Sequence, residues 1–451
     1  MSKALWSLAV CAAVWSSRCA AQSPVWTRAE DGHLHVTVPG IHGAVSVAVT
    51  IQSEGGQDKK AFLSQMTADN NWRTVFNSAT NSDDLRYVIE YMFPDSSVHR
   101  VTGSHKLNRV VETGVALGSE RHLRRRATTV LYDEFNSGHI NTNWWTHDRM
   151  AVGIGGFQIF SPEPANSYVR NGMLFIKPTL TVDHFGNDIM NHGTIDARQL
   201  WGDCIPAYGD NTCVTHGHDN RPIMSALLRS SAHIRYGRVE VQARLPIGDW
   251  LWPAIWLMPV TKHYGSGARS GEIDIMEAAG NLHLTDQHGQ SLGADCDRST
   301  IHYGIERSGP LNRRQSGKYR LQGTNFGRGF HTYWLDWTEA HIRIGVDDHT
   351  VLAVNTPQEG FWVDSNLPGT NIWAEGGRNA PFDRPFYLIL NVAVGDGFFW
   401  DGLIYSPYDR PWTSGASNDF RQFWNARHLW EPTWHGDDVA MRVRSVKMQQ
   451  Y

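Results

Sequence analysis

The stretch Glu272-Ile-Asp274-Ile275-Met276-Glu277 places three carboxylates within six residues. The residues between the acids are apolar and glycines flank the run, a pattern typical of a short buried strand. Glu272 and Asp274 are two positions apart and therefore share one face of such a strand. Glu277 would point away in a regular strand, but a one-residue bulge near Ile275 and Met276 would return it to that face. We therefore predict a bulged strand that gathers three acids.

Carboxylates crowded on one face repel one another, so the pKa of at least one of them must rise. A neutral acid beside a charged carboxylate is the arrangement that glycoside hydrolysis requires. The alternative is a surface strand whose acids are solvated.

A tryptophan-rich block lies just upstream, with Trp250, Trp252 and Trp256 within seven residues. Large indoles are costly to expose, so they belong either to the core or to a platform for flat apolar ligand faces. A sugar ring offers such a face through its C–H groups, while nearby polar side chains bind its hydroxyls. Acids and indoles joined by a short loop predict a carbohydrate cleft, with Trp252 and Trp256 as substrate-binding residues.

From about Thr129 to the C-terminus, the sequence resembles glycoside hydrolase family 16, specifically the animal laminarinases and β-1,3-glucan-recognition proteins. The block with the tryptophans and the acidic run are two of the matching stretches. The others are Tyr132–Phe135, Asn166–Asn171, Leu174–Thr179, Tyr236–Glu240, Phe330–Trp334, Asn371–Trp373, Pro381–Asp383 and Phe386–Gly395.

The resemblance implies an all-β fold, a β-jelly-roll sandwich whose concave face binds glucan, and retaining endo-hydrolysis of β-1,3 linkages. It assigns Glu272 as the nucleophile and Glu277 as the acid/base. Asp274 matches the residue that holds the geometry of the nucleophile and modulates its charge. His302 resembles the histidine that faces the acid/base, and we predict that it binds substrate, although a histidine beside aromatic residues can also be purely structural. The mechanism requires the two glutamate carboxyls to lie ~5–5.5 Å apart.

Two further residues, Asn166 and Trp373, lie in matching stretches, and we predict that both bind substrate. Many relatives hold a calcium ion through an aspartate in the last strand, but here Arg444 takes that position and would repel a cation. We read His216-Gly-His218-Asp219 as a solvated loop, because it lacks a further spaced ligand. We therefore predict no metal and no cofactor.

The N-terminus has the layout of a signal peptide over residues 1–21, with Lys3, a short apolar run over Leu5–Val14, and small residues before Gln22. The apolar run is too short to span a bilayer, so we predict a secreted, soluble protein. The alternative is a buried N-terminal helix.

Removal of residues 1–21 leaves Cys204, Cys213 and Cys296. In an oxidising compartment the close pair Cys204 and Cys213 is expected to form a disulfide, and the related recognition proteins carry a cystine in a similar loop. Cys296 is then left over, either buried and free or paired between chains.

Residues 22–102 read as short alternating strands separated by turn residues, which predicts a small immunoglobulin-like β-sandwich. Their order resembles the amino-terminal glucan-binding module of invertebrate recognition proteins, with Trp72 as the best candidate for a binding indole. A spacer or a partner-docking module is the alternative. Residues 103–128 read as a linker ending in the basic run Arg121–Arg126, a solvated connector or a protease site. The family 16 domain is predicted over 129–451.

Composition excludes two classes of partner. Charged residues make up 19% of the 451 residues and the net charge is −4, so nothing favours binding to nucleic acid or to an anionic membrane. Two functions remain for what we expect to be a monomer. One is an endo-β-1,3-glucanase acting on algal or fungal wall glucan. The other is a glucan-binding pattern-recognition protein with an immune-cascade partner. The intact acid triplet favours the enzyme.

Overall fold

The structure is a computed structural model of the chain. It describes the strand segments 25–28, 34–39, 46–52, 59–63, 71–76, 84–92 and 98–106, and then residues 127–153, 155–204, 213–306 and 311–451. The predicted signal peptide 1–21, the basic run Arg121–Arg126 and the side chain of Trp72 lie outside the described residues. The chain divides into two compact units, Met1–Arg121 and His122–Tyr451.

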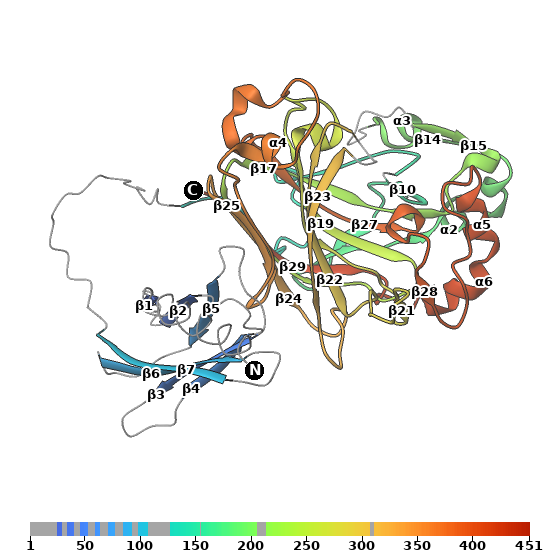
Figure 1. The fold of residues 1–451 in the computed structure, drawn as a ribbon. Coiled ribbons are helices and arrows are strands. Elements are labelled where there is room, and N and C mark those ends of the chain that lie inside the picture. Colours follow the sequence, from blue (N-terminus) through green and yellow to red (C-terminus); the bar gives the residue numbers. More distant parts are fainter. Residues whose placement is uncertain are drawn as a thin grey trace, which may run out of the picture. The chain divides into compact units, whose positions relative to one another are not determined.

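The first unit contains two antiparallel sheets, drawn in blue in Figure 1. The three-stranded sheet has the order β1 (Val25–Arg28), β2 (Leu34–Pro39) and β5 (Asn71–Phe76). The four-stranded sheet has the order β4 (Lys59–Leu63), β3 (Ser46–Gln52), β6 (Asp84–Met92) and β7 (Val98–Lys106). Strand β7 extends four residues past the predicted module boundary at 102. The immunoglobulin-like topology stays a prediction.

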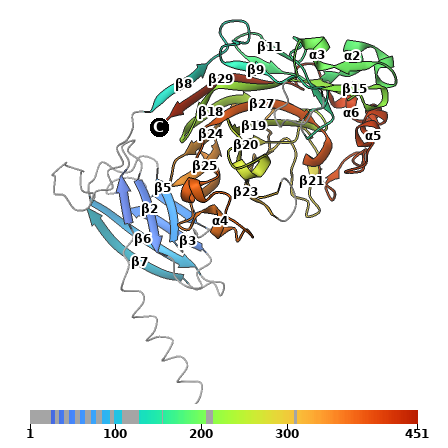
Figure 2. The ribbon, with the colours of Figure 1, turned by 90° about the horizontal axis from the view of Figure 1, so that it is seen from above.

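The second unit is built on two large antiparallel sheets that pack face to face (Figure 2). The seven-stranded sheet has the order β23 (Asn312–Arg320), β22 (Cys296–Gly304), β20 (Glu272–Glu277), β19 (Leu251–Pro259), β27 (Phe386–Val394), β17 (Leu227–Ile234) and β9 (Trp145–His147). The eight-stranded sheet has the order β11 (Ser167–Val169), β12 (Leu174–Ile176), β29 (Met441–Gln450), β18 (Gly237–Arg244), β24 (His331–Trp337), β25 (His341–Val346) and β26 (His349–Asn355), and β8 (Thr128–Asp133) pairs with β29. The predicted β-jelly-roll sandwich is confirmed.

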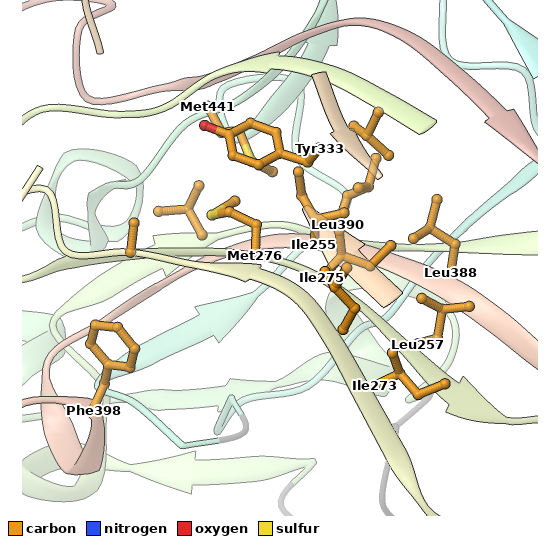
Figure 3. Packing of buried hydrophobic residues seen from close by; sticks show 14 of the residues in the cluster. Ile255, Leu257, Ile273, Ile275, Met276, Tyr333, Leu388, Leu390, Phe398 and Met441 are labelled. Carbon is orange, nitrogen blue, oxygen red and sulfur yellow. The ribbon is translucent and has the colours of Figure 1, made fainter. Parts of the chain in front are cut away.

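The core lies between these two sheets, because their strands alternate in burial. Every second residue of β18 is buried, as period-two side-chain alternation requires. From the seven-stranded sheet, Ile273 and Ile275 point inward, where they belong to the same apolar cluster as Tyr333 and Met441 of the other sheet (Figure 3). The opposite face of the seven-stranded sheet points away from the eight-stranded sheet, and we call it the outer face.

Short elements connect the sheets. The remaining strands are β10 (Gln158–Phe160), β13 (Thr179–Leu180), β14 (Thr194–Asp196), β15 (Val214–His216), β16 (Ile223–Ser225), β21 (Leu284–Thr285) and β28 (Ile404–Tyr405). The α-helices are α2 (Thr181–Phe185), α3 (Ala197–Trp201), α4 (Gly360–Asp364), α5 (Asp419–Asn425) and α6 (Arg427–Trp430). The 3-10 helices are η1 (Asn187–Met190), η2 (Gly217–Asp219), η3 (Gly267–Ser270), η4 (Ala374–Asn379), η5 (Asp396–Phe398) and η6 (Glu431–Thr433). Within the described ranges, none of the helices has the length and apolar character needed to cross a bilayer.

The cysteines follow the predicted pairing. Cys204 and Cys213 form a disulfide with a Cα–Cα distance of 5.8 Å. Cys296 at the start of β22 is free and fully buried in the core, so it is not placed to pair between chains. Burial also raises the pKa of its thiol to about 11, so at neutral pH the sulfur is protonated and unreactive.

Candidate active site

Strand β20 contains the predicted bulge. Against β22, the partners step from Asp274 opposite Thr300 to Glu277 opposite Arg298, so β20 uses three positions where β22 uses two. The register with β19 shifts at the same place. The extra residue reverses the alternation after Asp274, and Glu277 returns to the outer face. The bulge is therefore the local feature that collects the three acids.

All three carboxylates line one pocket on the outer face, with a volume of about 90 Å³. Its walls are mostly apolar. The lining residues are Phe160, Leu227, Trp252, Ala254, Trp256, Glu272, Asp274, Glu277, Asn391 and Ala393.

Both predicted tryptophans reach this pocket, but their environments differ. The Trp252 indole donates a hydrogen bond from Nε1 to Glu277 Oε1 at 3.0 Å, and its ring stacks on Phe398 with centroids 4.7 Å apart. Trp256 is only 8% exposed and donates from Nε1 to Asn391 Oδ1 at 2.7 Å. Trp252 thus holds an acid in place, whereas Trp256 forms the pocket floor with little ring surface left to stack on a ligand.

The environment of Glu277 suits a group that keeps its proton. Burial raises the pKa of this carboxyl, the nearby charge of Glu272 raises it further, and Arg298, His302 and the Trp252 hydrogen bond each lower it. The net pKa is above the ordinary glutamate value. A carboxyl of this kind can act as a general acid near neutral pH.

Asp274 lies beside Glu272 and pairs with a histidine. It is 3% exposed, and its Oδ2 lies 3.2 Å from His302 Nε2. Burial and the charge of Glu277 raise the pKa of Asp274 to about 6, although hydrogen bonds with His302 and Glu272 oppose this. Burial lowers the pKa of His302, but the hydrogen bond with Asp274 and the charges of the three acids dominate and raise it to about 9. At neutral pH the imidazolium therefore balances part of the negative charge.

His302 contacts Asp274 directly, and strand β22 pairs it with Glu272. The charge of Glu277 also raises the pKa of His302, and its role beside the acid/base stays a prediction. Ligand atoms of Glu272, Asp274 and His302 lie within 4.8 Å of one another, a spacing that could also hold a metal ion. The acid–imidazole contact accounts for that spacing without an ion, and the absence of a metal stays a prediction.

Asn166 does not bind substrate through this pocket. It is 1% exposed, and its Nδ2 donates to Lys177 O, Thr179 Oγ1 and Met224 O. Its side chain thus ties loops together in the interior, where no ligand reaches it.

Trp373 is also buried in the interior, against the prediction that it binds substrate. It is 1% exposed, donates from Nε1 to Arg269 O at 2.7 Å and packs edge-on against Trp362. A matching sequence stretch indicated its presence in the fold, but not the direction of its side chain.

The two loop histidines considered for a metal are engaged elsewhere. His216 Nδ1 lies 2.9 Å from Thr194 Oγ1, and His218 Nδ1 lies 2.7 Å from an Arg421 nitrogen. Arg444, which takes the position of the calcium-binding aspartate of relatives, is exposed with its guanidinium 4.0 Å from the ring centroid of Phe330.

Sequence reasoning missed three residues of the site. Arg298 is the cross-strand partner of Glu277, Asn391 fixes Trp256, and Phe398 supports Trp252. Phe398 lies in η5, within the loop Asp396–Trp400. Only the aromatic residues of that loop could have indicated from the sequence that it contributes to the site. Arg298 and Asn391 gave none, because each meets the site only through strand pairing.

The second unit is an antiparallel β-sandwich. One pocket on its outer face holds three acids and a hydrogen-bonded indole, and these features together indicate the class of protein. Residues 196–374 match the family model described as glycosyl hydrolases family 16. A β-1,3-glucan-binding protein of Penaeus monodon is 37% identical over 337 residues, which make up 70% of this chain and 88% of that protein. The chain belongs to glycosyl hydrolase family 16.

Two further comparisons describe its relatives. Glucan endo-1,3-beta-glucosidase A1 of Niallia circulans is 31% identical over 280 residues, which cover 60% of this chain and only 34% of that protein. The laminarinase structure from Rhodothermus marinus has a TM-score of 0.45 and 24% identity, and the alignment covers 72% of this chain and 97% of that one.

Proposed function

We propose that this protein is a secreted, retaining endo-β-1,3-glucanase. The observation that carries the proposal is the bulge in β20, which places Glu272, Asp274 and Glu277 together in one pocket. Three acids in an apolar pocket destabilise the fold by desolvation and mutual repulsion, so a chemical role is the best account of them. The names of the relatives, a glucan-binding protein and a glucan endo-1,3-beta-glucosidase, support β-1,3-glucan as the ligand.

The first step of the proposed mechanism uses both glutamates. Glu277 is the general acid, since burial raises its pKa and so favours the protonated form, and it gives its proton to the departing glycosidic oxygen. The Glu272 carboxylate attacks C1 and forms a covalent glycosyl-enzyme. The Trp252 indole fixes the orientation of the Glu277 carboxyl through its hydrogen bond, which limits the conformational cost of reaching the transition state.

In the second step, Glu277 is a carboxylate and accepts a proton from water, which attacks C1 and releases Glu272. Asp274 and His302 assist through charge. As Glu272 loses its negative charge and regains it, the adjacent Asp274–His302 pair can adjust its shared proton. That shift redistributes charge within the pair beside Glu272 and leaves the total charge of the pair unchanged.

The second candidate is a glucan-binding recognition protein without hydrolysis. It is favoured by the similarity to a β-1,3-glucan-binding protein of Penaeus monodon. Binding of a neutral glycan does not require three buried acids that repel one another, because uncharged polar side chains also bind hydroxyls. We therefore rank binding without catalysis second.

Release of reducing ends from laminarin separates the two candidates. The wild-type chain should release them, and Glu272→Gln should lower the rate by about 10³-fold or more, the scale of a lost nucleophile, while laminarin still binds. Glu359→Gln makes the same chemical change at an exposed position and should have no effect. Anomeric NMR of early product should show retention. Binding of laminarin by the wild-type chain without any turnover would reject the enzyme and leave the recognition role.

Secretion is proposed from the sequence of residues 1–21. Expression in animal cells should deliver the protein to the medium, and N-terminal sequencing should begin near Gln22. Retention inside the cell with residues 1–21 intact would reject this part of the proposal.

A further inference from the structure

Basic residues continue the outer face beyond the acids. Strand β20 pairs with β22, and β22 pairs with the edge strand β23, so each acid begins a row that crosses three strands. The three rows are Glu272, His302 and Arg314; Asp274, Thr300 and Ser316; and Glu277, Arg298 and Lys318. Both outer rows therefore run from an acid to two basic residues. We call Arg298, His302, Arg314 and Lys318 the basic margin.

Side-chain contacts confirm that these rows lie on the outer face. Thr300 Oγ1 donates to Ser316 Oγ at 3.2 Å, so the middle row is continuous. The intervening residues of β23 face the other way. Gln315 donates to the hydroxyl of Tyr303 in the core, and Tyr319 stacks on a histidine of β26 in the other sheet. Since strand side chains alternate, Arg314 and Lys318 share the face of the acids.

The charge of the basic margin is only partly balanced. His302 pairs with Asp274, but the buried Nε and Nη2 atoms of Arg298 find no hydrogen-bond partner among the described residues. The Arg298 guanidinium lies 3.7 Å from the ring centroid of Phe398. Burial and then the charge of Arg298 lower the pKa of Lys318, so these two cations repel each other. These basic residues lie close together although the whole chain has a net charge of −4.

We propose that the basic margin binds an anionic substituent, a sulfate ester or a carboxylate, on a glycan residue lying over β22 and β23. Lys318, opposite Arg298, and Arg314, opposite His302, are exposed and can contact the anion. Arg298, whose Nε and Nη2 atoms are buried, adds positive charge beneath them. Guanidinium and ammonium groups form charge-assisted hydrogen bonds with sulfate and carboxylate oxygens. An anion placed there would relieve the repulsion among the cations. The inference rests on the proposed function only in treating the outer face as a glycan-binding face.

Binding measurements test the inference separately from hydrolysis. In the Glu272→Gln background, calorimetric titration compares laminarin oligosaccharides that are unmodified, sulfated or carboxymethylated. At low ionic strength we expect one or both anionic oligosaccharides to bind more tightly than the neutral one. The combined variant Arg314→Gln and Lys318→Gln should weaken anionic binding about three- to tenfold, the scale of two partly exposed ion pairs, and leave neutral binding unchanged. The sulfate and carboxylate arms identify which anion is preferred.

The matched control removes two cations from the eight-stranded sheet, Arg343→Gln with Lys447→Gln, and should not change either affinity. Raising the salt concentration should reduce only the anionic advantage, because the Debye length shortens from ~10 Å at 0.1 M to ~3 Å at 1 M. Equal affinity for neutral and anionic oligosaccharides would overturn the inference, and so would equal losses in the two double variants. Failure of the proposed function would instead show as no laminarin hydrolysis by the wild-type chain.

Discussion

At the scale of single residues, one hydrogen bond links the tryptophan block to the acidic run. Trp252 and Glu277 are 25 positions apart, and the indole Nε1 donates to the carboxyl at 3.0 Å. A donor to a carboxylate favours its charged form, so this bond lowers the pKa of Glu277 against the larger effect of burial. The indole therefore tunes the proposed acid as well as holding it.

Replacing Trp252 with Phe removes the donor and keeps a ring against Phe398. The pKa of Glu277 should rise, and the alkaline limb of the kcat/KM profile should move to higher pH. The shift should reach at most about one unit, because solvent replaces part of a bond that contributes ~1.5–3 kcal/mol. Trp334→Phe, which removes an indole donor to Asp347 O, should leave the profile unchanged. An unshifted limb in Trp252→Phe would contradict this assignment.

His302 gives a pH-dependent contribution to stability. Its pKa in the folded protein is raised to about 9, above the ordinary value of ~6.5 expected after unfolding. The folded state therefore binds the proton more tightly, and the resulting stability is complete below pH ~6.5 and lost as pH rises through about 9.

Comparison of the wild type with His302→Gln by chemical denaturation measures this contribution. The wild type should be more stable than the variant at pH 6, and the difference should shrink by pH 10. A difference that grows with pH would show that the imidazole is not charged by its acidic neighbours.

At the scale of elements, the short 3-10 helices set the ends of the site. Trp373 joins η4 to η3 through its hydrogen bond to Arg269 O, and η3 directly precedes β20. Its contribution to function is therefore indirect, through the position of the strand that carries the acids.

Trp373→Ala should lower the free energy of unfolding by ~3–5 kcal/mol, as loss of a large buried aromatic does. Trp373→Phe should cost less and keep the KM for laminarin within about twofold, since no ligand contact is removed. Trp400→Ala, at a 39% exposed indole, should change stability little. A raised KM in Trp373→Phe with unchanged stability would restore the substrate-binding prediction.

At the scale of the whole molecule, the chain consists of two compact units. The first carries its own pair of sheets, and the acids all belong to the second. A truncated chain can therefore separate the proposed hydrolysis from any glucan binding by residues 22–102.

A shortened chain beginning near Thr128 should keep its rate on short soluble oligosaccharides. On insoluble β-1,3-glucan it should lose affinity and rate if residues 22–102 bind glucan, because a tethered second site raises the effective concentration. In the full chain, Trp72→Ala should weaken curdlan binding by ~0.5–1.5 kcal/mol, the worth of one aromatic contact. Equal rates of the full and shortened chains on insoluble glucan would favour a spacer or docking role.

The sequence by itself determined the features that depend on neighbours along one strand. The resemblance to glycoside hydrolase family 16 implied the β-jelly-roll sandwich. The spacing of Glu272, Asp274 and Glu277 predicted the bulge, because side-chain direction in a strand follows from position. In the first unit the sequence predicted short alternating strands over residues 22–102, and the described residues there form strands β1 to β7.

Only the tertiary structure decided which strands lie side by side, and with them the partners of the acids. Arg298 meets Glu277, and Asn391 meets Trp256, through pairings between strands that are distant in sequence. It also decided that Asn166 and Trp373 point inward. A motif shows that a residue belongs to the fold, but the direction of its side chain depends on strand register and loop packing, which are set by contacts with the rest of the chain.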